Sequence, residues 1–221
     1  MRLPDLTPGL RATTLAGAIA AAAIFGMPVI AAADNSIAIP PMNQGDPAWA
    51  GARLGASATD TIGSAGCAIT AVTMMLGYYG IQTDPASLNA WLTPSGGYAY
   101  WDQLVWDAVT RYSSGQVAFS GWFGPDLGLI QRELDAGRPV VAEVRLSGNQ
   151  HFVLLTGYRS ADGFVINDPW FADSVRFSDR YGDPASGIVS IRTFMPADAP
   201  LGLGQRHGWL ASAVDAVRRA Q

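Results

Sequence analysis

The sequence predicts an α+β fold, with helices in its first half and an antiparallel β-sheet in its second half. Apolar residues recur at helical spacing over residues 68–79 and again in shorter stretches up to about residue 134. Between residues 139 and 194, short β-branched and aromatic runs alternate with turn residues, a pattern typical of strands. Because no helix is expected between those strands, the pattern favours an antiparallel sheet.

Residues 1–33 have the pattern of a signal peptide for export. A positively charged opening leads into an apolar, alanine-rich stretch over residues 15–30, and Ala31-Ala32-Ala33 then supplies the small residues that a signal peptidase needs. We expect cleavage after Ala33, so that the mature protein is secreted or held in the cell envelope. The alternative is an uncleaved membrane anchor, against which Pro28 and the small-residue end argue.

The remaining chain has the composition of one globular domain. We expect residues 34–41 to be a short irregular tether or a residual pro-segment, residues 42–196 to form the domain, and residues 197–221 to be a linker that ends in a short helix, Trp209–Arg219. The net charge of −4 gives no electrostatic footprint for nucleic acid. No His/Cys cluster, phosphate-binding glycine loop or dinucleotide fingerprint is present, so the sequence indicates no cofactor and no metal.

The first expected helix carries the only cysteine of the chain at its start. Ala68 to Tyr79 is an apolar run with helical spacing, and Gly80 is a natural stop. Cys67 therefore lies at the helix N-terminus, where free backbone N–H groups and the helix dipole favour a thiolate. A single cysteine in an exported protein cannot form an internal disulfide, so it is an inert buried residue, a bridge to another chain or a reactive thiol.

Further helices are expected before the strands begin. Asp84 to Leu92 has Asp84 as its cap and Pro85 in its first turn. Trp101 to Tyr112 has helical spacing, and Pro125 to Leu134 is a helix that Gly137 stops. Five aromatic residues in this half are expected to belong to the core and its rim, with the lining of a cleft as the alternative: Trp91, Tyr98, Tyr100, Trp101 and Trp106.

Four strands are expected in the second half, and they place a histidine next to a carboxylate. The strands are Pro139–Val144, His151–Tyr158, Phe164–Asp168 and Ile188–Phe194. If a four-residue loop, 159–162, joins the middle two, Asp168 lies opposite Val153 and shares a sheet face with His151 as its diagonal neighbour. An odd loop length would present Asn167 instead.

Cys67, His151 and Asp168 are the residue types of a nucleophile, a base and a group that orients the base. In such a set the thiol is a thiolate and the histidine an imidazolium. The Cys67 N–H and the Gln44 side chain, in a polar loop before Trp49, are candidate donors to an oxyanion. The alternatives are a structural histidine at 151 and an ordinary surface glutamine at 44. The second histidine, His207, is expected to be a solvated loop residue.

These motifs, in this order, resemble the papain-like cysteine peptidases related to the bacteriocin-processing peptidases, in a stand-alone, peptidase-like branch found in bacteria. The motifs are Gln44, the pair Gly66-Cys67 opening an apolar helix, the run His151 to Tyr158, and Asn167-Asp168-Pro169. The resemblance covers Met42 to Phe194. It implies a papain-like fold in which the nucleophile helix packs on the C-terminal sheet.

The resemblance also implies the roles of four residues: Cys67 as nucleophile, His151 as general base and acid, Asp168 as orienting group and Gln44 as oxyanion donor. Two features depart from the pattern. Gln150 stands where relatives commonly have glycine. Bacteriocin-processing peptidases are cytosolic domains of exporters that act on double-glycine leaders, whereas this chain is expected to be exported and carries no transporter, so the resemblance does not identify its natural substrate.

The expected function is that of an exported thiol hydrolase that cleaves amide or peptide bonds through an acyl-enzyme. Its expected partner is a peptide or protein substrate, with no nucleic acid and no membrane after signal cleavage. Two alternatives remain open at this point. The same site transfers its acyl group to an amine, as in a transglutaminase or peptide ligase, or the domain is a non-catalytic module that binds peptides.

Overall fold

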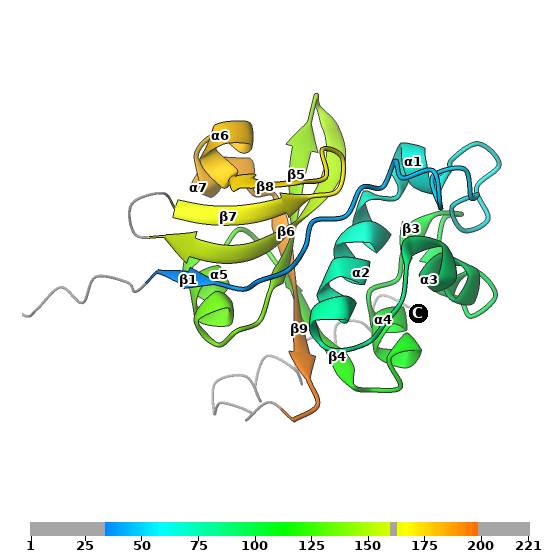
Figure 1. Ribbon diagram of the computed structural model, residues 1–221, viewed down its shortest axis with the longest axis horizontal. Helices are drawn as coiled ribbons and strands as arrows, with labels where there is room; N and C mark the ends of the chain where they lie inside the picture. Colours follow the sequence, from blue (N-terminus) through cyan, green and yellow to red (C-terminus); the bar gives the residue numbers. More distant parts are fainter. Residues whose placement is uncertain (1–33, 160–162, 199–221) are drawn as a thin grey trace, which may run out of the picture. The chain divides into compact units, whose positions relative to one another are not determined.

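An antiparallel sheet and the helix that begins at Cys67 are the two parts of the fold that position the candidate residues (Figure 1). The computed structural model describes residues 34–159 and 163–198, which all belong to one compact unit. The expected signal segment, His207 and the expected helix Trp209–Arg219 lie outside the described residues. No helix of the described part is long and apolar enough to cross a membrane.

The described chain forms helices and strands that are mostly short. The helices are α1 (Ile62–Ala65), α2 (Cys67–Tyr78), α3 (Pro85–Leu92), α4 (Asp107–Tyr112), α5 (Leu127–Asp135), α6 (Phe177–Tyr181) and α7 (Pro184–Gly187). The strands are β1 (Asn35–Ser36), β2 (Tyr98–Ala99), β3 (Gln103–Leu104), β4 (Val117–Phe123), β5 (Val140–Leu146), β6 (Asn149–Arg159), β7 (Gly163–Asp168), β8 (Asp173–Arg176) and β9 (Ser190–Pro196).

The main sheet has the strand order β4-β9-β5-β6-β7-β8, and β1 adds a short pairing to β6. Every pairing is antiparallel. The predicted α+β class with an antiparallel sheet is confirmed at this level. The expectation that no helix interrupts the strands is wrong, because α6 and α7 lie between β8 and β9.

Helix α2 begins at Cys67 because Gly66 interrupts the helical conformation between α1 and α2. Thr61 caps α1 through a reciprocal pair of hydrogen bonds with Ser64. A Cβ on Gly66 would lie 2.4 Å from the carbonyl oxygen of Ile62, so only glycine fits at this junction. Helix α2 ends near Gly80, whose φ of +82° is the left-handed conformation that favours glycine.

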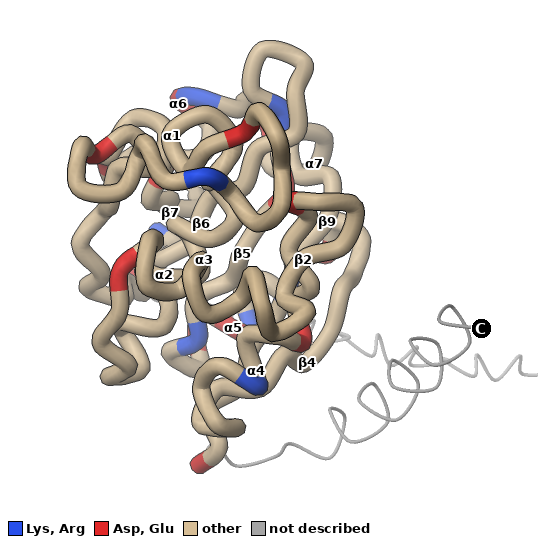
Figure 2. The backbone as a smooth tube through the Cα atoms, turned by 90° about the vertical axis from the view of Figure 1, so that its right-hand side faces the viewer, with Lys and Arg blue, Asp and Glu red and all other residues tan. Residues whose placement is uncertain are grey.

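Helix α2 packs against β6, the strand that carries His151. Figure 1 shows α2 lying alongside the sheet, with α3 and α4 on its other side. Residues of α2 and of the central strands β5 and β6 form much of the core, since Val72, Met75, Val140 and Leu154 are fully buried. Charged residues are few and scattered along the described backbone (Figure 2).

The segment 34–41 is not the irregular tether that we expected. Asn35 and Ser36 pair with Tyr158 and Gly157 of β6, and the next amide, that of Ile37, donates to the carbonyl of Thr156 over 2.7 Å. Ile37 and Ile39 are buried on alternate positions, as in a strand with one face on the core. This segment is therefore part of the domain.

Two other expectations need adjustment. The predicted helix Trp101–Tyr112 is helical only in α4, because Tyr98 to Leu104 turns back as the β2–β3 hairpin. Tyr100 and Trp101 form the turn of that hairpin with positive φ angles of 46° and 82°. Strand β4 lies in the half that we expected to be helical. By contrast, α3 begins as predicted, with the Asp84 side chain accepting from the backbone N–H of Ser87.

Candidate active site

The register between β6 and β7 brings Asp168 to His151, although the loop differs from the one we assumed. Arg159 pairs with Gly163, so three residues, an odd number, separate the two strands. The register then shifts between Leu155 and Gly157, because β6 has a bulge there. The bulge cancels the effect of the odd loop, so that Leu154 pairs with Asn167 and the next position outward places Asp168 opposite Val153.

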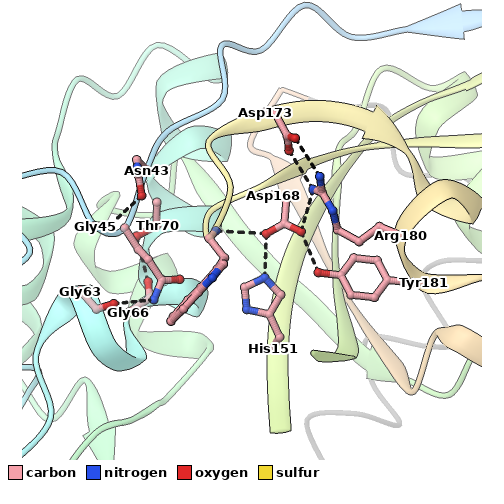
Figure 3. A network of polar contacts seen from close by, with 12 residues as sticks. Asn43, Gly45, Gly63, Gly66, Thr70, His151, Asp168, Asp173, Arg180 and Tyr181 are labelled. Atoms are coloured by element: carbon pink, nitrogen blue, oxygen red, sulfur yellow. Dashed lines mark hydrogen bonds and ion pairs between the residues drawn. The ribbon is translucent and has the colours of Figure 1, made fainter. Parts of the chain in front are cut away.

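His151 lies between the candidate nucleophile and the carboxylate. Its Nε2 is 2.8 Å from Oδ1 of Asp168 (Figure 3), and the Cys67 thiol lies near enough to raise the pKa of the ring. Because Nε2 is engaged by Asp168, Nδ1 is the ring nitrogen left for the thiol. All three side chains are buried, with Asp168 fully so.

Asp168 accepts hydrogen bonds on both of its oxygens. Besides His151, Oδ1 accepts from the backbone N–H of Trp170 over 3.0 Å. Oδ2 accepts from the hydroxyl of Tyr181 over 2.7 Å and from Nη1 of Arg180 over 3.1 Å. Arg180 is in turn held by both oxygens of Asp173 (Figure 3). Four donors therefore hold one buried carboxylate in a single orientation.

The electrostatics favour an ionised Asp168 and a protonated His151. Burial alone raises the pKa of Asp168, but the hydrogen bonds from His151 and Tyr181 outweigh it, and the pKa lies below its usual value. Burial likewise lowers the pKa of His151, yet its hydrogen bond to Asp168, together with the influence of the nearby Cys67 thiol and the charge of Asp168, raises that pKa to about 9. At neutral pH the histidine is therefore an imidazolium placed beside the thiol.

Gln44 is buried beside the same site rather than exposed on a surface loop. Its side-chain amide Nε2 donates to the carbonyl of Gly63 over 3.0 Å, and its backbone N–H donates to the carbonyl of Pro169 over 2.8 Å. The indole of Trp49 holds the same loop by donating to the carbonyl of Asn43. Nε2 has a second hydrogen, so the side chain has a donor available beyond its bond to Gly63.

One cavity contains these groups. It has a volume of about 630 Å³, and Gln44, Cys67 and His151 line it together. Aromatic side chains, among them Trp106 and Trp122, form part of the remaining wall. Of the five aromatic residues for which we left core and cleft open, Trp106 is a buried wall of this cavity, while Tyr100 and Trp101 are largely exposed.

The structure thus brings together all four residues that the sequence singled out. Sequence reasoning did not find the groups behind Asp168, namely the Trp170 N–H, Arg180 and Tyr181. Arg180 and Tyr181 lie on α6 and follow Asp168 in the sequence by 12 and 13 residues. Within the described residues, no group of three or more His, Cys, Asp or Glu side chains is placed to hold a metal ion.

A comparison with protein-family models decides the family. The model described as "Peptidase_C39 like family" matches residues 36–185. The chain belongs to this family. As a C39-like protein it is related to papain-type cysteine peptidases, as the resemblance in its motifs implied, and the family suggests a function like that of a cysteine peptidase. A search of curated proteins found no match to the chain.

Proposed function

We propose that this C39-like protein is a thiol hydrolase that cleaves amide or peptide bonds through an acyl-enzyme on Cys67. The observation that carries the proposal is the arrangement of His151, which lines the same cavity as Cys67, close enough for the thiol to raise its pKa, and which hydrogen-bonds to the buried carboxylate of Asp168. Such an arrangement activates a thiol, because the imidazolium stabilises the thiolate and the carboxylate stabilises the imidazolium.

In the first half of the reaction, the Cys67 thiolate attacks the carbonyl carbon and a C–S bond forms. Negative charge develops on the carbonyl oxygen, toward which the Cys67 backbone N–H and the free Nε2 hydrogen of Gln44 would donate. The C–N bond then breaks, and the departing amine takes the proton of the His151 imidazolium. Cys67 now carries the acyl group, and His151 is neutral.

In the second half, water attacks the acyl carbon. Neutral His151 accepts a proton from that water, the C–S bond breaks and the carboxylic acid leaves. The thiolate–imidazolium pair forms again. Throughout the cycle Asp168 holds the ring with Nδ1 toward Cys67, because its four donors fix the carboxylate.

We further propose that the protein acts after export, on a peptide or protein substrate. The support is the signal-like pattern of residues 1–33, which lie outside the described residues. An exported C39-like protein meets substrates other than the leader peptides of a transporter. Amino-terminal sequencing of the protein recovered from its host tests the export step, with Asp34 expected as the first residue.

The experiment that tests the catalytic proposal is cleavage of a peptide pool, followed by mass spectrometry. We expect the wild-type protein to produce new termini and Cys67→Ala to produce none, while the melting curves of the two proteins agree. A free carboxyl group at the new C-terminus of a product indicates hydrolysis. An amide formed there with an added primary amine would indicate acyl transfer. Since the chain contains no lysine, the added amine is not in competition with lysine side chains of the enzyme. Equal cleavage by Cys67→Ala would refute the proposal.

A further inference from the structure

The cavity that contains Cys67 also has a buried arginine that the proposed reaction does not use. Arg192, on β9, is only 1% exposed and lines this cavity. Its Nη2 donates to Oε2 of Glu143 over 3.1 Å, and its Nη1 donates to the hydroxyl of Ser190. A buried ion pair is weak evidence for stability, because removing two charges from water is expensive. Its place in the wall of the cavity points to a role in binding.

Aromatic rings surround the guanidinium of Arg192. Its central carbon lies 4.0 Å from the ring centre of Trp122 and 4.9 Å from those of Trp106 and Phe152. Such stacking fixes the plane of a guanidinium and leaves its N–H edge free to recognise an acceptor. All three of these aromatic residues line the same cavity as Arg192.

The hydrogen-bonding capacity of Arg192 is not filled. Its Nε is buried and has no acceptor, whereas nearly all buried polar groups in proteins have a partner. A guanidinium has five N–H donors, and leaving one buried and unpaired costs free energy. A ligand oxygen that accepted from this edge would remove that cost on binding.

Glu143 compensates the positive charge of Arg192 only in part. The same carboxylate also accepts from Arg145 over 2.7 Å, from Gln150 over 3.0 Å and from Ser190 over 2.7 Å. One negative charge thus faces two positive ones. The pKa of Arg192, although lowered to about 10 by burial, keeps the guanidinium charged at neutral pH. Glu143 is not among the residues that line the cavity, and the lining residue with a carboxyl group is Asp102 on the β2–β3 hairpin, where burial and Asp60 raise its pKa.

We propose that Arg192 forms a substrate subsite that binds a carboxylate, either the side chain of Asp or Glu in a peptide or the carboxylate at its C-terminus. This inference rests on the proposed function, since it names the class of substrate for the same cleft. Trp122, the ring nearest the guanidinium, is 59% exposed and also borders a second cavity of about 380 Å³. Because Nε is buried, the proposal includes a displacement of the Trp122 ring that lets a carboxylate reach Nε.

The test measures binding rather than turnover. The probes are four pools of acetylated octapeptides made otherwise of neutral residues. Each pool contains either Glu or Gln, placed in turn at every position, and its peptides end in either a free carboxylate or an amide. Each pool is equilibrated by dialysis with the full chain carrying Cys67→Ala, and bound peptides are quantified by mass spectrometry. We expect pools with a carboxylate to bind about tenfold or more tightly than the amidated Gln pool, as for a hydrogen bond between charged groups. The comparison of the two single-carboxylate pools identifies which source the subsite takes.

A matched pair of substitutions assigns the effect to Arg192. Arg192→Gln leaves Glu143 with three partners, so the fold should survive, and melting curves check this. Arg145→Gln removes the same charge from the same carboxylate, but Arg145 is not among the residues that line the cavity. We expect Arg192→Gln to abolish the preference for a carboxylate and Arg145→Gln to retain it.

Three results would overturn the inference: equal binding of all four pools, no binding of any of them, or a preference that survives Arg192→Gln. These outcomes are separate from the failure of the proposed function, which depends on Cys67. A wild-type protein that cleaves peptides with no preference for acids would leave the peptidase proposal standing and refute the subsite alone.

Discussion

Replacing Asp168 with Asn tests the arrangement around His151, because it removes one charge and changes almost no volume. The asparagine oxygen can take the place of Oδ1 and keep the bonds from His151 and Trp170. Its amide group then faces Nη1 of Arg180 and the Tyr181 hydroxyl, where the native carboxylate accepts from both. Tyr181 can turn and accept, but Arg180 has only donors.

The expected losses follow from these contacts. A hydrogen bond between charged groups contributes about 1.5–3 kcal/mol, and the substitution weakens two of them, to Arg180 and to His151. We therefore expect the free energy of unfolding to fall by about 2–5 kcal/mol. Without the carboxylate, the pKa of His151 should drop from about 9 by at least about one unit, equivalent to about 1.4 kcal/mol.

The loss of stability should itself depend on pH. The native pKa of His151 is raised, so the stabilisation from its charged form is complete below the unfolded value of 6.5 and disappears as the pH rises through about 9. The native pKa of Asp168 is lowered from 3.8, so its contribution is present above that value and is lost in acid. The difference between wild type and Asp168→Asn should therefore be largest near pH 5–6 and smaller at pH 10.

Two measurements check this prediction. Urea denaturation at pH 6 and pH 10 gives the free energies, and an NMR titration of the imidazole protons gives the pKa of His151. The chain has only two histidines, so His207→Ala assigns the signals. An unchanged stability at pH 6, together with an imidazole that still titrates near pH 9 in Asp168→Asn, would refute the reasoning.

Three further predictions concern Gln44, Glu143 and the N-terminal strand. Gln44→Ala should lower kcat by about 10²–10³-fold through loss of an oxyanion donor, and a loss below about fivefold in a peptide-cleavage assay would exclude that role. Because hydrogen bonds lower the pKa of Glu143 from 4.5 to about 2 despite its burial, the stability it provides should be present above pH 4.5 and lost as the pH falls to 2. The difference in unfolding free energy between wild type and Glu143→Gln should shrink over that interval, and a constant difference in urea denaturation would contradict this. Ile37→Ala should cost about 2–4 kcal/mol of unfolding free energy, as for a buried isoleucine, while Ala38→Ser on the exposed side should cost almost nothing. Equal small effects of these two substitutions would restore the interpretation of residues 34–41 as a tether.

Much of the fold followed from local patterns in the sequence. Helix α2 was predictable because its apolar spacing is unbroken and glycine follows it, and α3 because Asp84 and Pro85 mark its start. The central strands were predictable from their β-branched runs. Asp168 has the register that we predicted, but the reasoning behind that prediction was incomplete. We assumed an even loop, whereas the structure combines an odd loop with a bulge at Thr156; Gly157 beside it, an isolated glycine within a strand, was a signal for such a bulge that we did not use.

The other elements depend on contacts between distant parts of the chain. Strand β1 exists because Asn35 and Ser36 pair with residues of β6 that lie more than 120 positions further along the chain. Strand β4 has a glycine and a serine that weaken its alternation, so its pairing with β9 decides its structure. Arg180 and Tyr181 gave no signal in the sequence, since only the path of β8 and α6 turns both toward Asp168. Local patterns therefore identified the reacting groups but not the groups that hold them.

The central claim is that His151 activates Cys67, and the pH dependence of alkylation by iodoacetamide tests it most directly. Free thiols ionise near pH 8.5, whereas catalytic cysteines paired with a cation ionise at about 3.5–7.5. Since Cys67 is the only cysteine, the mass of the intact protein reports its reaction alone. We predict rapid alkylation at pH 5 in the wild type and in His207→Ala, and slow alkylation in His151→Ala. Slow reaction at pH 5 in all three proteins, with an ordinary thiol profile, would contradict the account and make Cys67 a structural residue of a peptide-binding module.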